Sequence, residues 1–345
     1  MNKLKKFRIK IGFLLSCLIF CFLQIPLYAE ENAETNVSSP VTIIDMGMKP
    51  AVKMQESTLD YENPYNTYET LKVPTQITKQ GDYYFIVDCY HNQVIYTKNM
   101  GIPLKQWKVM TNDVTLPHAI ASDGNFYLVA DTEKNRILVF EWKNGRFQNT
   151  QRLDDIGIRP HYIQYDKETD SFFVWSSMTG DMYILNKAPD TETLCIREVR
   201  HIKELGNYYV RSFTIDGNQI IFPSGTNRYM MIVNKNTFEV LGRYPVTSEI
   251  SGMAYVLPIG SYYYMTVSCD ANANQDAATF IRTNDLNGLA QGKYEVMYQY
   301  VSNKGIPYYI DHFNDAFYMT NSGVSNNIWR FQVLNDQITG VNAMY

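Results

Sequence analysis

The chain has 345 residues, of which 45% are hydrophobic and 19% are charged. This composition provides enough apolar side chains for a core, so it excludes a protein that is mostly disordered. The formal net charge is −4 and no basic stripe follows the sequence, which argues against nucleic acid as a partner. The length allows one large domain or two small ones.

Residues 1–29 have the pattern of a secretory signal peptide. Five basic residues lie within positions 1–10, an apolar stretch covers 11–27, and Ala29 precedes two glutamates, so we predict cleavage after Ala29. The apolar run of about 17 residues is near the lower limit for spanning a bilayer, which leaves an uncleaved signal anchor as the alternative. Leu14–Cys17 also weakly resembles a lipobox. We expect an extracytoplasmic protein, secreted or held at the cell surface, with no membrane span after cleavage.

Cleavage changes both the charge and the cysteine content. Removing residues 1–29 removes five basic residues and no acids, which takes the formal net charge from −4 to −9. An acidic secreted protein does not seek anionic lipid or DNA. Cys89, Cys195 and Cys269 remain, and three cysteines cannot all pair within one chain. We predict that they are buried thiols without disulfides.

A repeat of short β-rich runs separated by Gly, Asn and Asp turns decides the fold class. Its six units start at residues 74, 117, 160, 210, 251 and 307. Four runs in about 40 residues are typical of a propeller blade. We predict an all-β, six-bladed β-propeller of four-stranded antiparallel blades over residues 74–345, with second strands at 82–88, 125–131, 171–175, 219–222, 261–267 and 316–320.

Three segments fall outside the regular repeat. In the fifth unit, 270–277 and 283–293 are predicted to be polar surface loops. Residues 30–73 form an N-terminal extension, with 30–40 expected to be disordered. Residues 41–73 either lie across one face or add an edge strand. The last unit has its own fourth strand at Gln337–Ala343, so closure of the ring does not require an N-terminal strand.

The best-defined unit is PHAIASDGNFYLVADTEKNRILVFE at residues 117–141. This pattern resembles the NHL-repeat family of six-bladed propellers, and the resemblance extends over about residues 74–345. It implies the fold but no single function, because propellers bind ligands, hydrolyse, act as lyases or serve as scaffolds. It also implies that the first strand of each blade lines a central channel.

The second residue of each first strand would then belong to one ring at the channel mouth: Thr75, His118, His161, Arg211, Gly252 and Tyr308. We predict that His118, His161, Arg211 and Tyr308 bind a ligand there. A polar, partly basic mouth on an acidic protein would attract an anion. His118 and His161 could instead supply two ligands of a divalent metal, or hydrogen-bond the blade backbone. His312 would face the same side as Tyr308 but lie roughly 13 Å deeper.

Other candidates have a structural alternative. Asp88 and Asp131 could hold a cation, but such residues usually fix turns. Tyr162, Tyr208, Tyr209, Tyr308 and Tyr309 could form platforms for a sugar or peptide, with packing as the alternative. The aromatic side chains of the second strands are expected to fill the wedges between blades: Tyr83, Tyr84, Phe126, Tyr127, Phe172, Phe173, Tyr262, Tyr263, Tyr264, Phe317 and Tyr318.

The sequence contains no complete catalytic motif. The first hypothesis is therefore a binding propeller without chemistry, which recognises a small anionic molecule, a glycan or a peptide. The second is a metal-assisted hydrolase or lyase of the lactonase or NHL-lyase type, and the third is a scaffold of the cell envelope. Whether the protein is an enzyme stays open at this point.

Overall fold

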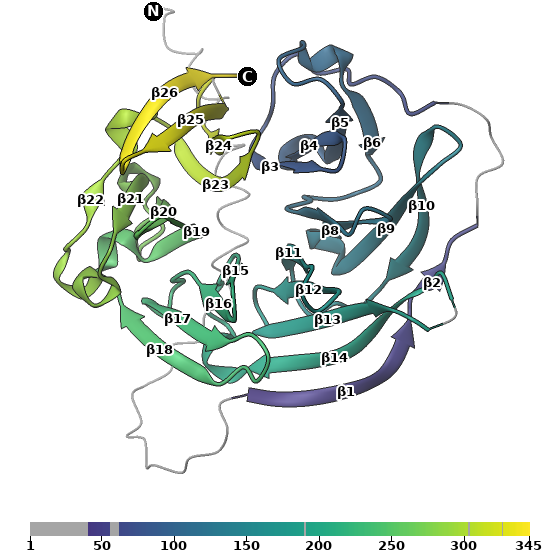
Figure 1. Cartoon of the computed structure of the whole chain (residues 1–345), viewed down its shortest axis with the longest axis horizontal. Coiled ribbons are helices and arrows are strands. Elements are labelled where there is room, and N and C mark those ends of the chain that lie inside the picture. Colours follow the sequence, from purple (N-terminus) through teal and green to yellow (C-terminus); the bar gives the residue numbers. More distant parts are fainter. Residues whose placement is uncertain (1–40, 56–61, 190, 303, 326) are drawn as a thin grey trace, which may run out of the picture. The chain divides into compact units, whose positions relative to one another are not determined.

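Six antiparallel sheets follow one another along the chain and form the six blades of a β-propeller (Figure 1). The computed structural model describes residues 41–55, 62–189, 191–302, 304–325 and 327–345. The signal peptide predicted at 1–29 and the disorder predicted at 30–40 lie outside these residues. Within them, the helical segments are 3-10 turns of three to six residues, and none is a candidate for crossing a membrane.

Each blade contributes four consecutive strands, and the first strand of each is innermost (Figure 1). Blade 1 contains β3 (Pro74–Gln80), β4 (Tyr83–Asp88), β5 (Gln93–Thr97) and β6 (Lys108–Thr111). Blade 2 contains β7 (Ile120–Ser122), β8 (Phe126–Asp131), β9 (Arg136–Lys143) and β10 (Arg146–Leu153). Blade 3 contains β11 (Pro160–Asp166), β12 (Ser171–Ser176), β13 (Asp181–Lys187) and β14 (Leu194–Ile202).

The C-terminal half repeats this order. Blade 4 contains β15 (Thr214–Asp216), β16 (Gln219–Phe222), β17 (Tyr229–Asn234) and β18 (Val240–Pro245). Blade 5 contains β19 (Gly252–Ile259), β20 (Tyr262–Cys269), β21 (Thr279–Thr283) and β22 (Glu295–Val296). Blade 6 contains β23 (Ile306–Phe313), β24 (Ala316–Ser322), β25 (Ile328–Leu334) and β26 (Gln337–Ala343). The predicted six-bladed, four-stranded architecture is confirmed, and the predicted second strands agree with the observed ones to within two residues.

The N-terminal segment adds edge strands, which decides between the two alternatives for residues 41–73. β1 (Val41–Pro50) pairs with β14 of blade 3, and β2 (Val52–Lys53) pairs with β10 of blade 2 (Figure 1). Further along, the Val109 amide donates to the Pro64 carbonyl at 2.7 Å in blade 1. These parts of the segment therefore cover the outer edges of blades 3, 2 and 1 in that order, where exposed strand edges would otherwise invite aggregation.

The ring closes between blades 6 and 1 without a shared strand in the described residues. The seam is held by side chains: the Tyr345 ring packs on Trp107 with centroids 5.8 Å apart, and its hydroxyl accepts the Gly101 amide at 2.9 Å. Phe313 packs in the same apolar cluster as Trp107. Hydrophobic burial therefore replaces strand exchange as the closing interaction.

Asp88 and Asp131 bind backbone amides as predicted, but those of the loop before the first strand and not those of the turn that follows each aspartate. Asp88 accepts the Lys72 amide at 2.7 Å, and Asp131 accepts the Thr115 amide at 2.6 Å, sixteen residues earlier in each case. Both carboxylates are fully buried. They anchor the loops that lead into the first strands of blades 1 and 2, which are the strands that line the channel.

The core lies mainly between the blades, as the aromatic pattern predicts. Phe126, Phe172 and Tyr264 are almost fully buried in the largest apolar cluster. The prediction of a polar surface loop at 283–293 is wrong in part. A 3-10 helix, η7 (Leu286–Gln291), forms there and buries Leu286 and Leu289 in the apolar cluster of blades 4 and 5. Two leucines three residues apart can share one face of a turn, which a count of polar residues overlooks.

Candidate functional site

The first strands of four blades, β3, β11, β19 and β23, carry a β-bulge near their second residue. In β11 the pairing with β12 shifts between Pro160 and Tyr162, and in β23 it shifts between Pro307 and Ile310. A bulge adds one residue to its strand, so two consecutive side chains can face the same side. This local irregularity directs an additional side chain from each strand into the channel.

Five side chains meet at the start of the first strands: His118, His161, Tyr209, Arg211 and Tyr308. We call them the channel-mouth cluster. The imidazole centroids of His118 and His161 are 3.9 Å apart, and the Tyr308 ring lies 6.2 and 6.4 Å from them. Blades 2, 3 and 6 supply these three rings, so the contacts cross the channel.

The hydrogen bonds of both imidazoles define their protonation. His118 Nδ1 lies 2.8 Å from the Leu116 carbonyl oxygen, and His161 Nδ1 lies 2.9 Å from the Arg211 carbonyl oxygen. Because a carbonyl can only accept, each Nδ1 carries the proton and donates. Each Nε2 is left as an acceptor in the neutral ring, and Nε2 of His161 accepts from the Tyr209 and Tyr308 hydroxyls at 3.4 Å.

The surroundings keep both imidazoles neutral. Burial, followed by the charge of Arg159, lowers the pKa of His118 to about 3. Burial, the neighbouring His118 and Arg159 hold the pKa of His161 well below its usual range. At neutral pH both rings are therefore unprotonated on Nε2, and the Nε2 lone pair of His161 is engaged by the Tyr209 and Tyr308 hydroxyls.

Arg211 supplies a positive charge beside the two imidazoles. Its guanidinium donates to Ser268 Oγ at 2.7 Å and to the Gly252 carbonyl at 3.2 Å, and it lies 5.0 Å from the centre of the Tyr209 ring. Although burial disfavours the charge, the Tyr209 phenol and the Cys269 thiol raise the pKa of Arg211 above its ordinary value. None of the described ion pairs joins Arg211 to a carboxylate. Its positive charge is therefore not compensated by a counter-charge at the channel mouth.

The donor set does not fit a metal ion with three protein ligands. The described ranges hold no group of three or more His, Cys, Asp or Glu side chains that could bind a metal. Beside the two histidines lie two phenols and the guanidinium of Arg211, and the charge of Arg211 would repel a cation. Two imidazoles alone leave such a site incomplete.

Below the mouth, three tyrosines close the channel. The Tyr162 hydroxyl lies 3.3 Å from that of Tyr255 and 3.2 Å from that of Tyr309. All three side chains are buried, and they come from blades 3, 5 and 6. We call them the tyrosine plug. Tyr162 and Tyr309 therefore pack rather than form platforms.

The prediction for His312 is wrong because of the bulge in β23. The His312 ring is exposed and packs on Phe317 of the next strand, with centroids 4.5 Å apart. Its neighbour Asp311 faces the channel instead, where Thr78 hydrogen-bonds it. Burial raises the pKa of Asp311 to about 6, although the bond to Thr78 lowers it. The bulge adds one residue to β23 before these two positions. Asp311 therefore takes the face on which His312 was expected, and His312 takes the opposite face.

The structure brings all four predicted ligand-binding residues together, although their binding role stays a prediction. Thr75 packs beside them through a contact with the Pro117 carbonyl, and Gly252 accepts from Arg211. Sequence reasoning missed Arg159 and Cys269. Their positions in the repeat could have identified them. Arg159 directly precedes the start of β11, and Cys269 is the last residue of β20.

The predicted thiols are found as expected. Cys89, Cys195 and Cys269 are buried and form no disulfide in the structure. Cys89 Sγ lies 3.9 Å from His118 Nε2, and Cys269 Sγ lies 3.9 Å from the Arg211 guanidinium. Two of the three cysteines therefore border the channel-mouth cluster.

Solved structures with the same fold include two putative 6-phosphogluconolactonases. The one from Bacteroides uniformis has 13% identity and a TM-score of 0.58, over 79% of this chain and 86% of that chain. The one from Bacteroides fragilis has 11% identity and a TM-score of 0.54, over 89% and 95%. A streptogramin B lyase has 14% identity and a TM-score of 0.54, over 81% and 85%.

No protein-family model matches the sequence, and neither does any curated protein sequence. The NHL repeat therefore stays a resemblance. Since the three structures are less than 25% identical to this chain, their likeness shows the fold and carries nothing about a substrate. What the chain shares with the lactonases and the lyase is the overall fold.

Proposed function

We propose that the propeller binds a small anionic ligand at the channel-mouth cluster. The observation that carries the proposal is the half-buried Arg211 guanidinium, which has no carboxylate partner among the described residues. A partly buried charge without a counter-charge is costly, and an anion would compensate it. The Tyr209 and Tyr308 hydroxyls lie in the same cluster, where each donates to His161 Nε2.

The neutral imidazoles add a dependence on pH. An anion next to His118 and His161 favours their protonated form, so it raises the pKa of both rings. Ligand binding then takes up protons where the pH is close to these raised pKa values, and affinity for the anion increases as the pH falls toward them. A neutral glycan or peptide would not produce this coupling.

The test uses calorimetry with inorganic phosphate and citrate as anionic probes, and maltose and trialanine as neutral ones. Arg211→Gln should weaken binding of an anion at least about tenfold, since one charge-assisted hydrogen bond contributes roughly 1.5–3 kcal/mol. Arg243→Gln is the matched control, because Arg243 pairs with Glu204 on the surface. Preference for the neutral probes, or an unchanged affinity in Arg211→Gln, contradicts the proposal.

A hydrolase or lyase is the second candidate, favoured by the unprotonated Nε2 atom of His118. A general base needs an unprotonated nitrogen at neutral pH, and His118 provides one. The solved propellers named as lactonases and a lyase support testing lactones first. Loss of turnover in His118→Gln with retained ligand binding would support this candidate, and equal turnover in both proteins would contradict it.

We also propose an extracytoplasmic location, which rests on the sequence of residues 1–29. N-terminal sequencing of the protein from its native host tests it. A mature chain that starts at Glu30 supports secretion. A chain that retains residues 1–29 would favour the signal anchor.

A further inference from the structure

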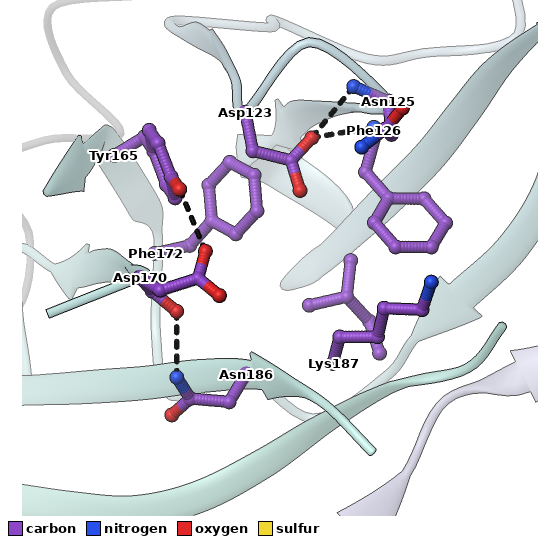
Figure 2. A pocket seen from close by; sticks show the side chains of 9 residues that line it. Asp123, Asn125, Phe126, Tyr165, Asp170, Phe172, Asn186 and Lys187 are labelled. Carbon is purple, nitrogen blue, oxygen red and sulfur yellow. Dashed lines mark hydrogen bonds between the residues drawn. The ribbon is translucent and has the colours of Figure 1, made fainter. Parts of the chain in front are cut away.

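A second cavity lies between blades 2 and 3, at the opposite end of their first strands from the channel-mouth cluster. Its walls come from the turn between β7 and β8 and from the turn between β11 and β12 (Figure 2). Its volume is about 140 Å³. This is close to the roughly 150 Å³ of an engineered cavity that admits benzene, so it can hold one compact ligand.

Two carboxylates converge on this cavity. Asp123 accepts the Asn125 and Phe126 amides at 2.8 and 2.7 Å through Oδ1, and Asp170 accepts the Tyr165 hydroxyl at 2.6 Å through Oδ1. Figure 2 shows the second oxygen of Asp123 pointing into the space between the two phenylalanine rings, and the second oxygen of Asp170 beside the Phe172 ring on the side of Asn186. The internal bonds fix the orientation of both groups and leave an acceptor on each for a ligand.

Three aromatic side chains and Leu194 supply the apolar part of the walls. Phe126 and Phe172 are each 2% exposed, and Tyr165 also lines the cavity. Among the described residues that line the cavity, Lys187 carries the one ammonium, which forms an ion pair with Glu192 at 3.0 Å. The two carboxylates therefore dominate the charge of the cavity. The raised pKa of Tyr165, about 12, agrees with this, because its hydrogen bond to Asp170 and the charges of Asp170 and Asp123 disfavour the phenolate.

Asn186, which lines the cavity, has a side-chain oxygen without a hydrogen-bond donor among the described residues. This oxygen is buried, while the amide nitrogen of the side chain donates to the Asp170 carbonyl at 2.7 Å. An unmet buried acceptor costs free energy. The Asn186 amide nitrogen faces Asp170 (Figure 2), so this residue holds the backbone of the turn that carries one of the two carboxylates.

We propose that this cavity binds a compact organic ammonium ion, with its charged group between Asp123 and Asp170 and its apolar body against the phenylalanine rings. Carboxylates supply the counter-charge, and aromatic faces attract cations through their quadrupole. This site is separate from the anion site at the channel mouth and would take a ligand of opposite charge. Failure of one proposal leaves the other unaffected.

The test compares tert-butylammonium with tert-butanol, which has nearly the same shape but no charge, by ligand-observed NMR and calorimetry on the whole protein. Tert-butylammonium should bind at least about tenfold more tightly than tert-butanol. Asp123→Asn and Asp170→Asn keep the acceptor that holds each turn, and each should weaken ammonium binding about fivefold or more. Lys187→Gln should strengthen it about twofold, since it removes a like charge.

The control is Asp276→Asn, an exposed carboxylate in blade 5, which should leave the affinity unchanged. Circular dichroism verifies that each variant is folded. Equal binding of the alcohol and the ammonium overturns the proposal, as does binding of methyl glucoside or Ca²⁺ in preference to the amine. Absence of any ammonium binding at roughly 10 mM, which corresponds to about −3 kcal/mol, overturns it as well.

Discussion

The histidine pair should make the protein sensitive to mild acid. In the unfolded chain an imidazole has a pKa of about 6.5 and takes up a proton as the pH falls. In the folded protein His118 resists protonation, because burial and Arg159 lower its pKa to about 3. Between these two values the unfolded state binds more protons, so stability falls as the pH falls. Above pH 6.5 His118 contributes no pH dependence.

The magnitude follows from the two pKa values. Between pH 7 and pH 5 the unfolded imidazole gains most of a proton while His118 in the folded state gains almost none, which costs about 2 kcal/mol of folding free energy. This figure hardly depends on how far below 5 the folded pKa lies. His161 shifts in the same direction. Asp311 acts in the opposite sense over this range, and its effect is the same in the wild type and His118→Gln, whereas His312→Gln removes a charge that lowers the Asp311 pKa.

The assay is urea denaturation at pH 7, 6 and 5 of the wild type, His118→Gln and His312→Gln. His312 is exposed on the outer part of β23 and is the matched control. We expect His118→Gln to lose about 2 kcal/mol less than the wild type between pH 7 and 5, and His312→Gln to lie much closer to the wild type. If His118→Gln has the same pH dependence as the wild type, the imidazole is not held neutral in the fold and the account of the channel mouth is wrong.

Three further predictions concern stability. Burial raises the pKa of Asp311 to about 6, so Asp311→Asn should gain up to about 3 kcal/mol at pH 8, with the gain shrinking below pH 6; urea midpoints that do not differ between the two proteins at pH 8 would contradict this. Gly180→Ala should cost at least about 3 kcal/mol, because its Cβ would lie 2.7 Å from the Gly206 nitrogen. Gly217→Ala, with open space around it, should cost only about 1 kcal/mol, and equal melting temperatures would refute the steric argument. Tyr345→Ala removes the ring on Trp107 and should cost about 2–3 kcal/mol; an unchanged unfolding free energy would show that the seam is held by other contacts.

The sequence by itself determined the architecture because its signals are local. Alternating apolar residues and Gly, Asn and Asp turns specify each strand over a few residues. The recurrence of these runs specifies the number of blades. Since repeats share one register, the same argument brought His118, His161, Arg211 and Tyr308 to one end of the first strands, where the structure has them in contact or close together.

The tertiary structure alone decided which side chains line the deeper channel. A bulge shifts the parity of a strand by one residue, and nothing in the alternation around Tyr308 reveals it. Asp311 rather than His312 therefore faces the channel, and Tyr162 and Tyr309 meet Tyr255 in the tyrosine plug. Their contacts join blades that are far apart in sequence.

The edge strands and the second cavity depend on the same kind of distant contact. The pattern of residues 41–53 favours extended backbone but does not name β14 or β10 as its partners, because many strand edges offer equivalent hydrogen bonds. Asp123 and Asp170 belong to turns of different blades, and each satisfies a local turn or hydrogen-bonding rule. Only the packing of blade 2 against blade 3 aims both carboxylates at one cavity, since that geometry arises from the wedge between sheets and not from either turn.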